Sequence, residues 1–340
     1  MVRPEFSSSS SATVSTTRQA PSTSVVSTFA KCDIIDFTSQ ADNSSVQTVL
    51  YLKSISKIAC FHQNGLITLY EADTHYPVKT FKAHSGAITA SCFDGKKKRL
   101  ITQYIGEIKI WDLTTIRFTQ VSVINLEISI ANSLEVFKKK NTLVVAGEYK
   151  CWKKPNQFDT MFLVDIETKD VLSTWKDWAV VQSTQKVRFG KGRYLLACGF
   201  SNGYLKLFSC DKKFNCIRIV KAHQTKINKL HVTRINQHPF CLTESDDKRI
   251  RLWNINSQLT ALRTWNFPQK TIIGGTYYNH KVMILFQGTQ VIFVNLIKGN
   301  MFKRVDVGVS GIARGLTFGR QPKVLAVLDI NKLSFLGIKN

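Results

Sequence analysis

Beyond residue 40 the chain alternates short apolar runs with turn residues at nearly even spacing. The longest apolar runs, residues 282–286 and 291–294, have the length of a strand, whereas about 20 apolar residues are needed for a membrane-spanning helix. Strand-length runs bounded by turns are typical of all-β domains, and their close succession leaves little room for the helices of α/β enzymes. The pattern therefore predicts an all-β fold without a transmembrane segment.

The apolar runs recur as a repeat of about 44 residues. In the two clearest copies, residues 83–112 and 222–254, an Ala-His pair opens the repeat and a strand ending in Trp-Asp or Trp-Asn closes it. Five weaker copies have strands in register with these, which makes seven positions equivalent: Tyr70, Trp111, Val164, Phe208, Trp253, Val294 and Leu336. Neighbouring positions are 41 to 53 residues apart, and the longest gap contains a polar segment, residues 151–156, which we interpret as an inserted loop.

The two clearest copies resemble the WD40 repeat, in which a Gly-His-like pair is followed by two strands, an Asp-containing turn and a strand ending in Trp-Asp. The resemblance covers about 300 residues and is strong in two repeats. It implies a seven-bladed β-propeller of four-stranded antiparallel blades over residues 29–340.

The last repeat is one strand short, because residues 312–318, 324–328 and 333–338 supply only three strands before the chain stops. Upstream, residues 32–37 (Cys-Asp-Ile-Ile-Asp-Phe) precede the first repeat and have no other partner. An unpaired sheet edge exposes backbone donors and acceptors. We therefore expect an N-terminal strand, residues 30–38, to complete the last blade and close the ring.

The resemblance also implies a structural hydrogen-bond network, because a buried His, Ser, Asp and Trp link the turn to the strands in blades of this family. The fifth repeat supplies His223, Ser245, Asp247 and Trp253. The second repeat keeps His84 and Trp111 but has Ile105 in place of the Asp. Ser, His and Asp also form hydrolytic triads, but no oxyanion-hole motif accompanies them here.

Motifs for enzymatic, cofactor or metal chemistry are not found. Residues 190–192 form a lone Gly-x-Gly, and the sequence contains no phosphate-binding Gly-x-x-x-x-Gly-Lys motif. The eight cysteines are scattered without a Cys-x-x-Cys, and the seven histidines form no metal-ligand pattern. We therefore expect no enzyme activity, no cofactor, no metal and no small-molecule substrate.

The first 28 residues differ from the rest, because 14 of them are Ser or Thr. We expect them to form a disordered tail that is open to phosphorylation. They contain no apolar signal segment, and two arginines with two prolines are a poor basis for a mitochondrial targeting helix. Unpaired cysteines favour a reducing compartment, so the expected location is intracellular, in the cytoplasm or nucleus.

The positive charge lies mainly in the second half of the sequence. The net charge is +24, of which residues 1–178 carry +4 and residues 179–340 carry +20. By repeat register we assign Lys186, Arg188 and Lys226 to the rim where the innermost strands begin, which is the usual partner surface of the family. A one-sided basic surface favours an acidic partner.

The sequence therefore predicts a scaffold for protein–protein interactions in a multi-subunit complex, with an acidic protein as the expected partner. Direct binding of RNA or a ribonucleoprotein by the basic half is the alternative hypothesis. Binding to phosphoinositides or an anionic membrane surface is a third, which has only charge and size in its favour.

Overall fold

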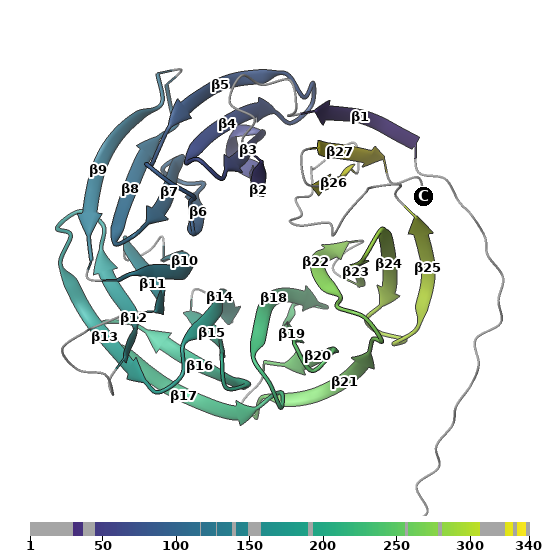
Figure 1. Cartoon of the computed structure of the whole chain (residues 1–340). Coiled ribbons are helices and arrows are strands. Elements are labelled where there is room, and N and C mark those ends of the chain that lie inside the picture. Colours follow the sequence, from purple (N-terminus) through teal and green to yellow (C-terminus); the bar gives the residue numbers. More distant parts are fainter. Residues whose placement is uncertain are drawn as a thin grey trace, which may run out of the picture.

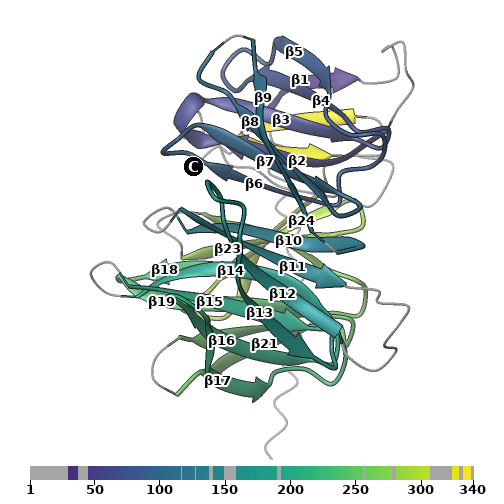
Figure 2. The ribbon, with the colours of Figure 1, turned by 90° about the vertical axis from the view of Figure 1, so that its left-hand side faces the viewer.

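The computed structural model describes residues 30–36, 45–115, 117–126, 128–137, 141–148, 158–189, 193–255, 258–277, 281–306, 324–328 and 332–337 of the chain. Apart from one short 3₁₀ turn, η1 (Lys53–Ile55), the regular structure in these residues consists of β-strands. The strands form antiparallel sheets arranged in a ring (Figure 1). Figure 2 shows the same ring from the side.

Six blades have four strands, which follow one another along the chain from the centre of the ring outward. Blade 1 contains β2 (Val46–Leu52), β3 (Lys57–His62), β4 (Leu66–Glu71) and β5 (Pro77–Lys82). Blade 2 contains β6 (Ala90–Asp94), β7 (Arg99–Tyr104), β8 (Glu107–Asp112) and β9 (Thr119–Asn125). Blade 3 contains β10 (Ile130–Phe137), β11 (Thr142–Glu148), β12 (Phe158–Asp165) and β13 (Val171–Asp177).

The other three complete blades repeat this order. Blade 4 contains β14 (Val181–Phe189), β15 (Arg193–Phe200), β16 (Tyr204–Cys210) and β17 (Phe214–Lys221). Blade 5 contains β18 (Ile227–Ile235), β19 (His238–Ser245), β20 (Arg249–Asn254) and β21 (Thr260–Asn266). Blade 6 contains β22 (Ile272–Tyr277), β23 (Val282–Gln287), β24 (Gln290–Asn295) and β25 (Met301–Asp306).

The seventh sheet has three described strands in the order β1-β27-β26. The N-terminal strand β1 (Ala30–Asp36) pairs antiparallel with β27 (Lys332–Gly337), which pairs with β26 (Val324–Leu328). The described residues therefore form six four-stranded blades rather than the seven expected. The expected inner strand of the seventh, residues 312–318, and the Ser/Thr-rich residues 1–28 lie outside the described residues. Closure of the ring by the N-terminal strand is confirmed.

A β-bulge recurs at the repeat position predicted from the sequence. In each sheet, the equivalent position lies in the strand next to the outer one, where the pairing register with the outer strand shifts. These residues are Tyr70, Trp111, Val164, Phe208, Trp253, Val294 and Leu336. A bulge bends its strand and increases the local twist. The repeat register is thus confirmed, and it marks a constant geometric feature of every sheet.

The core consists of apolar clusters that join one blade to the next. Alternate residues of a strand point to opposite faces of its sheet, so Leu100 packs against blade 1 while its neighbour Ile101 packs against blade 3. In the same way Leu143 faces blade 2 and Val144 faces blade 4. Strands buried on both faces require continuous apolar sequence, which explains the unbroken apolar runs of the chain.

Side chains of one blade also accept backbone N–H groups from the inner strand of the next blade. The backbone N–H of Leu230 in blade 5 donates to Ser183 Oγ in blade 4 at 3.2 Å. The backbone N–H of Ile273 in blade 6 donates to Glu244 Oε2 in blade 5 at 2.8 Å. These bonds satisfy inner-strand donors that face away from their own sheet. They tie each blade to the next around the ring.

Candidate functional site: the blade network and the two ends of the ring

Blade 5 contains a buried hydrogen-bond chain. His223 lies in the segment between β17 and β18, and its Nδ1 is 3.0 Å from Asp247 Oδ2. Its Nε2 is 2.7 Å from Thr243 Oγ1, and Trp253 Nε1–H donates to the same hydroxyl at 2.9 Å. The order of the chain is Asp247, His223, Thr243, Trp253. A neutral imidazole fits every position, because Nδ1–H donates to the carboxylate and Nε2 accepts from the threonine.

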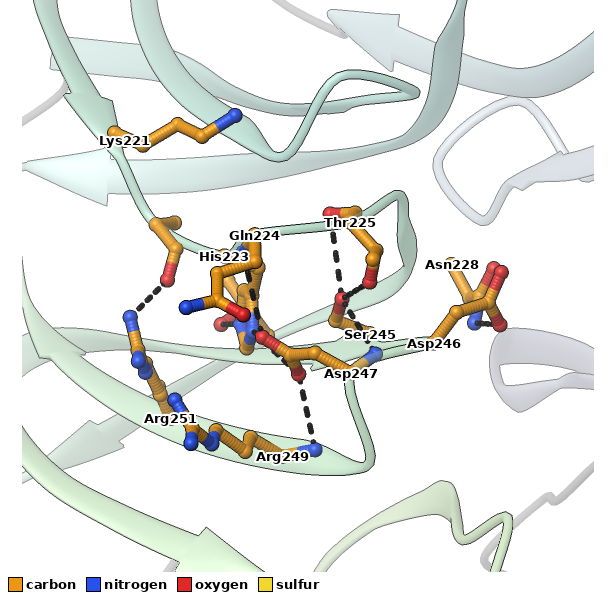
Figure 3. Close-up of polar contacts among 12 residues, drawn as sticks. Lys221, His223, Gln224, Thr225, Asn228, Ser245, Asp246, Asp247, Arg249 and Arg251 are labelled. Carbon is orange, nitrogen blue, oxygen red and sulfur yellow. Dashed lines mark hydrogen bonds and ion pairs between the residues drawn. The ribbon is translucent and has the colours of Figure 1, made fainter.

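Asp247 connects this chain to the backbone (Figure 3). Its carboxylate accepts the N–H groups of Gln224 at 3.4 Å and Arg249 at 3.0 Å. The first belongs to the segment that enters the blade, and the second begins the third strand. Asp247 therefore fixes the turn between β19 and β20 against the entering segment.

Ser245, which the sequence placed in the network, lies beside the chain rather than in it. Its hydroxyl is 3.0 Å from Thr225 Oγ1 and accepts the backbone N–H of Asp247 at 3.3 Å (Figure 3). The residue that links His223 to Trp253 is Thr243, which the sequence analysis missed. The expected Ser-His-Asp relation is therefore corrected to Thr-His-Asp.

Blade 2 repeats the link without the aspartate. His84 Nε2 is 2.9 Å from Thr102 Oγ1, and Trp111 Nε1–H donates to that hydroxyl at 3.0 Å. Ile105, in the place expected for Asp, lies exposed in the turn. The nearest carboxylate to His84 Nδ1 is that of Glu107 at 3.4 Å, without the alignment of a hydrogen bond.

Both histidines are held neutral by burial. Burial lowers the pKa of His84 to about 4, and nearby Lys109 adds to the effect while Glu107 opposes it. Burial also lowers the pKa of His223, against the opposing effect of Asp247. Thr243 is fully buried and His223 almost so. A hydroxyl sealed in this way is not accessible to a substrate, so the geometry fits a structural role rather than nucleophilic catalysis.

A sequence signal for the bridging threonine exists. The second strands of the two blades contain Leu100-Ile101-Thr102-Gln103 and Cys241-Leu242-Thr243-Glu244. In both, the threonine links His to Trp, and the next residue accepts a backbone N–H from the following blade, Gln103 from Ala131 and Glu244 from Ile273. In both well-formed repeats, this pair of polar residues follows an apolar run. The pair is therefore the sequence signal that identifies the two bridging threonines.

The three candidate rim residues are not brought together. Lys186 lies within β14, three-quarters buried, and its ammonium donates to the carbonyl of Val136 in blade 3. Arg188 lies near the end of β14, whereas Lys226 precedes β18 and is 3.8 Å from Asp246. Neighbouring inner strands run in the same direction, since Leu230 contacts Ser183 and Arg234 donates to the carbonyl of Arg188.

Arg188 and Lys226 therefore lie at opposite ends of the ring. A strand rises about 3.3 Å per residue, so β14 alone spans roughly 30 Å. Of the three, only Lys226 lies where an inner strand begins, and the expectation of one shared rim is wrong. We call the end of the ring where inner strands begin the entry end. The end where each inner strand turns back into the second strand is the hairpin end.

The hairpin end carries positive charge in its inner hairpins, whereas its outer turns, between the third and fourth strands, also carry acids such as Glu71, Glu167 and Asp211. Its inner hairpins are residues 52–57, 94–99, 137–142, 188–193, 234–238 and 277–281. Their described parts contain ten cations: Lys53, Lys57, Lys96, Lys97, Lys98, Arg99, Arg188, Arg193, Arg234 and Lys281. The single acid in these parts is Asp94, which is buried. At the entry end, the described residues of segments 83–89, 126–129, 178–180, 222–226 and 267–271 contain two cations, Lys226 and Lys270.

A central cavity of about 940 Å³ lies beside these hairpins. The lining comes from inner strands β2, β6, β10 and β14, with one residue from β18 (Figure 1). Its charged side chains are Lys53, Lys96, Lys186, Lys229 and Glu135. Burial raises the pKa of Glu135 against the opposing charge of Lys186, and burial lowers the pKa of Lys229.

We predict that Thr243→Val lowers the free energy of unfolding by about 3 kcal/mol, because two buried groups lose their partner at about 1–3 kcal/mol each. Ser245→Ala should cost about 1 kcal/mol, since it removes hydrogen bonds at the turn only. Denaturant unfolding measures both, with Thr243→Ser as the control that keeps the hydroxyl. An equal or larger loss for Ser245→Ala would contradict the assigned chain.

The lowered pKa of His84 predicts a pH effect. The unfolded histidine takes up a proton below its ordinary pKa of 6.5, whereas the folded one does so only near 4. Its contribution is therefore present above pH 6.5 and is lost as the pH falls toward 4. Between pH 7.5 and 5 the loss should be about 2 kcal/mol. Thermal unfolding of His84→Gln should show a correspondingly weaker pH dependence, and an unchanged pH dependence would contradict the assignment.

Two searches of the described residues bear on other functions. No helix in them is long and apolar enough to cross a membrane. No group of three or more His, Cys, Asp or Glu side chains in them is arranged to hold a metal ion.

Comparison with known proteins gives one family match. The sequence model described as WD domain, G-beta repeat matches residues 214–254. This segment runs from β17, the outer strand of blade 4, through the third strand of blade 5, and it contains the whole hydrogen-bond chain. No curated protein matches the chain. The match identifies residues 214–254 as a WD repeat, and together with the ring of four-stranded antiparallel blades it supports a WD40-repeat β-propeller.

Proposed function

We propose that this chain is a non-catalytic scaffold that docks an acidic protein partner on its hairpin end, within a larger assembly. The observation that carries the proposal is the charge of the inner hairpins, where ten described cations face one buried acid. Three of the cations are paired: Lys57 with Glu71, and both Lys97 and Arg99 with Glu167. The rest are available to attract an acidic surface.

A protein partner is favoured over RNA by the position of the aromatic side chains. Binding of single-stranded RNA relies on exposed aromatic rings on which bases stack. Among the described residues the exposed aromatic side chains are Tyr76, Trp178 and Phe302, and none of them lies in an inner hairpin. Other rings pack between blades, as Phe81 of blade 1 does against Trp111 of blade 2 at 4.9 Å between centroids. The described residues of the inner hairpins thus offer charge without an exposed aromatic ring.

The proposal predicts that Lys98→Glu/Arg188→Glu/Arg193→Glu abolishes capture of the native partner, because it reverses three exposed charges at the hairpin end. The matched control is Lys226→Glu/Lys248→Glu/Lys270→Glu, which makes the same change of charge at the entry end. Affinity purification of the full-length chain, with and without nuclease, compares the recovered partners.

Loss in the hairpin variant alone, with nuclease present, supports the proposal. Equal loss in both variants would show a general charge effect and contradict it. Partners that disappear on nuclease treatment would point to RNA, as would an affinity that falls by about 10³ or more between 50 and 200 mM salt.

A further inference from the structure

The hairpin side of the central cavity is lined by lysines that are not neutralised. Lys53 and Lys96 belong to the hairpins that follow β2 and β6, and both side chains line the cavity. No carboxylate of the described residues lies within 4 Å of either ammonium group. Lys186 lies further in, on β14. Its ammonium, which has three N–H donors, donates to Val136 O and lies 5.7 Å from the centre of the Phe137 ring.

The acidic side chain of the cavity cannot balance these charges. Glu135 is a single carboxylate, and one of its oxygens already accepts the backbone N–H of Lys186 at 3.3 Å. Its other oxygen is 4.0 Å from the Lys186 ammonium, a weak contact. Toward the entry end the cavity wall adds Lys229, which has no carboxylate of the described residues within 4 Å. The described wall therefore carries four cations and one anion.

The cavity has the size of a small-ligand site and offers a neutral donor. Its volume of about 940 Å³ lies in the range of small-molecule sites. Ser54, next to Lys53 on the hairpin side, also lines it. In a concave site with walls of low dielectric constant, the electric field of the charged side chains is concentrated. This raises the local concentration of anions. Lysine ammonium groups bind phosphate oxygens as mobile point charges.

We propose that the hairpin side of the cavity binds a compact anion that carries several phosphate groups. Lys53, Lys96 and Lys186 contact the phosphates, with the Ser54 hydroxyl as a further donor. The position inside the ring selects a small ligand, because a macromolecule can reach only the mouth. This inference does not rest on the docking of a protein partner, because the docking test reverses Lys98, Arg188 and Arg193, none of which lines the cavity.

The probe is inorganic tripolyphosphate, titrated into the full-length chain by calorimetry and thermal unfolding at constant ionic strength. We expect one saturable site per chain, a rise in Tm, and binding about tenfold tighter than that of orthophosphate, since more charges are neutralised at once. Lys53→Gln/Lys96→Gln should weaken the binding by about tenfold or more.

The matched control is Lys212→Gln/Lys213→Gln, which removes two exposed charges outside the cavity and should leave the affinity within about twofold. The absence of a saturable site, or equal weakening by both pairs, would overturn the proposal.

A second arm uses vesicles containing phosphorylated inositol lipids. Cosedimentation that tripolyphosphate reverses identifies the ligand as a lipid headgroup, and tripolyphosphate binding without cosedimentation identifies it as a soluble molecule. The Lys53→Gln/Lys96→Gln variant separates the two proposals. If it binds tripolyphosphate more weakly but still captures the protein partner, the anion site and the docking surface are distinct.

Discussion

The packing of each blade against its two neighbours is the constraint on which the structure depends. A blade is a thin sheet with two apolar faces, and neither face can be buried within the blade itself. Trp253 of blade 5 shares a cluster with Leu207 of blade 4, while Leu252 packs with Leu285 of blade 6. The same alternation runs around the ring, so a missing neighbour would expose a whole apolar face to water. The ring must therefore close, and the return of β1 to the last sheet follows from this requirement.

Closure also decides where the charges act. Because every inner strand runs in the same direction, hairpins far apart in the sequence meet at one end of the ring. Lys53 and Lys96 come from the half of the sequence with a net charge of only +4, yet they line the cavity with Lys186 from the other half. Among the inner hairpins and the starts of the inner strands, the distribution of positive charge therefore depends on the end of the ring as well as on the half of the sequence. The buried chain from Asp247 to Trp253 contributes by fixing the turns of its blade.

The sequence was informative wherever a repeat imposed a constant geometry. Trp111 and Trp253 set a register that the weaker repeats shared, because each sheet has a bulge at that position. The network was only partly predictable, since Ser245 and Thr243 are both polar residues of one strand and only the pairing geometry separates them. The prediction of one shared rim was wrong for a different reason. The end of the ring that a side chain reaches depends on its place along a nine-residue strand, and similar basic residues at the start and end lie on opposite surfaces.

Closure by β1 holds the entire ring together. Thermal unfolding of two truncated chains tests this most directly. One chain begins at residue 30 and keeps β1, and the other begins at residue 37 and lacks it. Loss of β1 should lower Tm by several degrees, at about 2–4 °C for each kcal/mol lost. It should also speed up hydrogen exchange of the backbone amides in all six complete blades. A melting temperature within about a degree of the longer chain, with unchanged exchange, would contradict this role of β1.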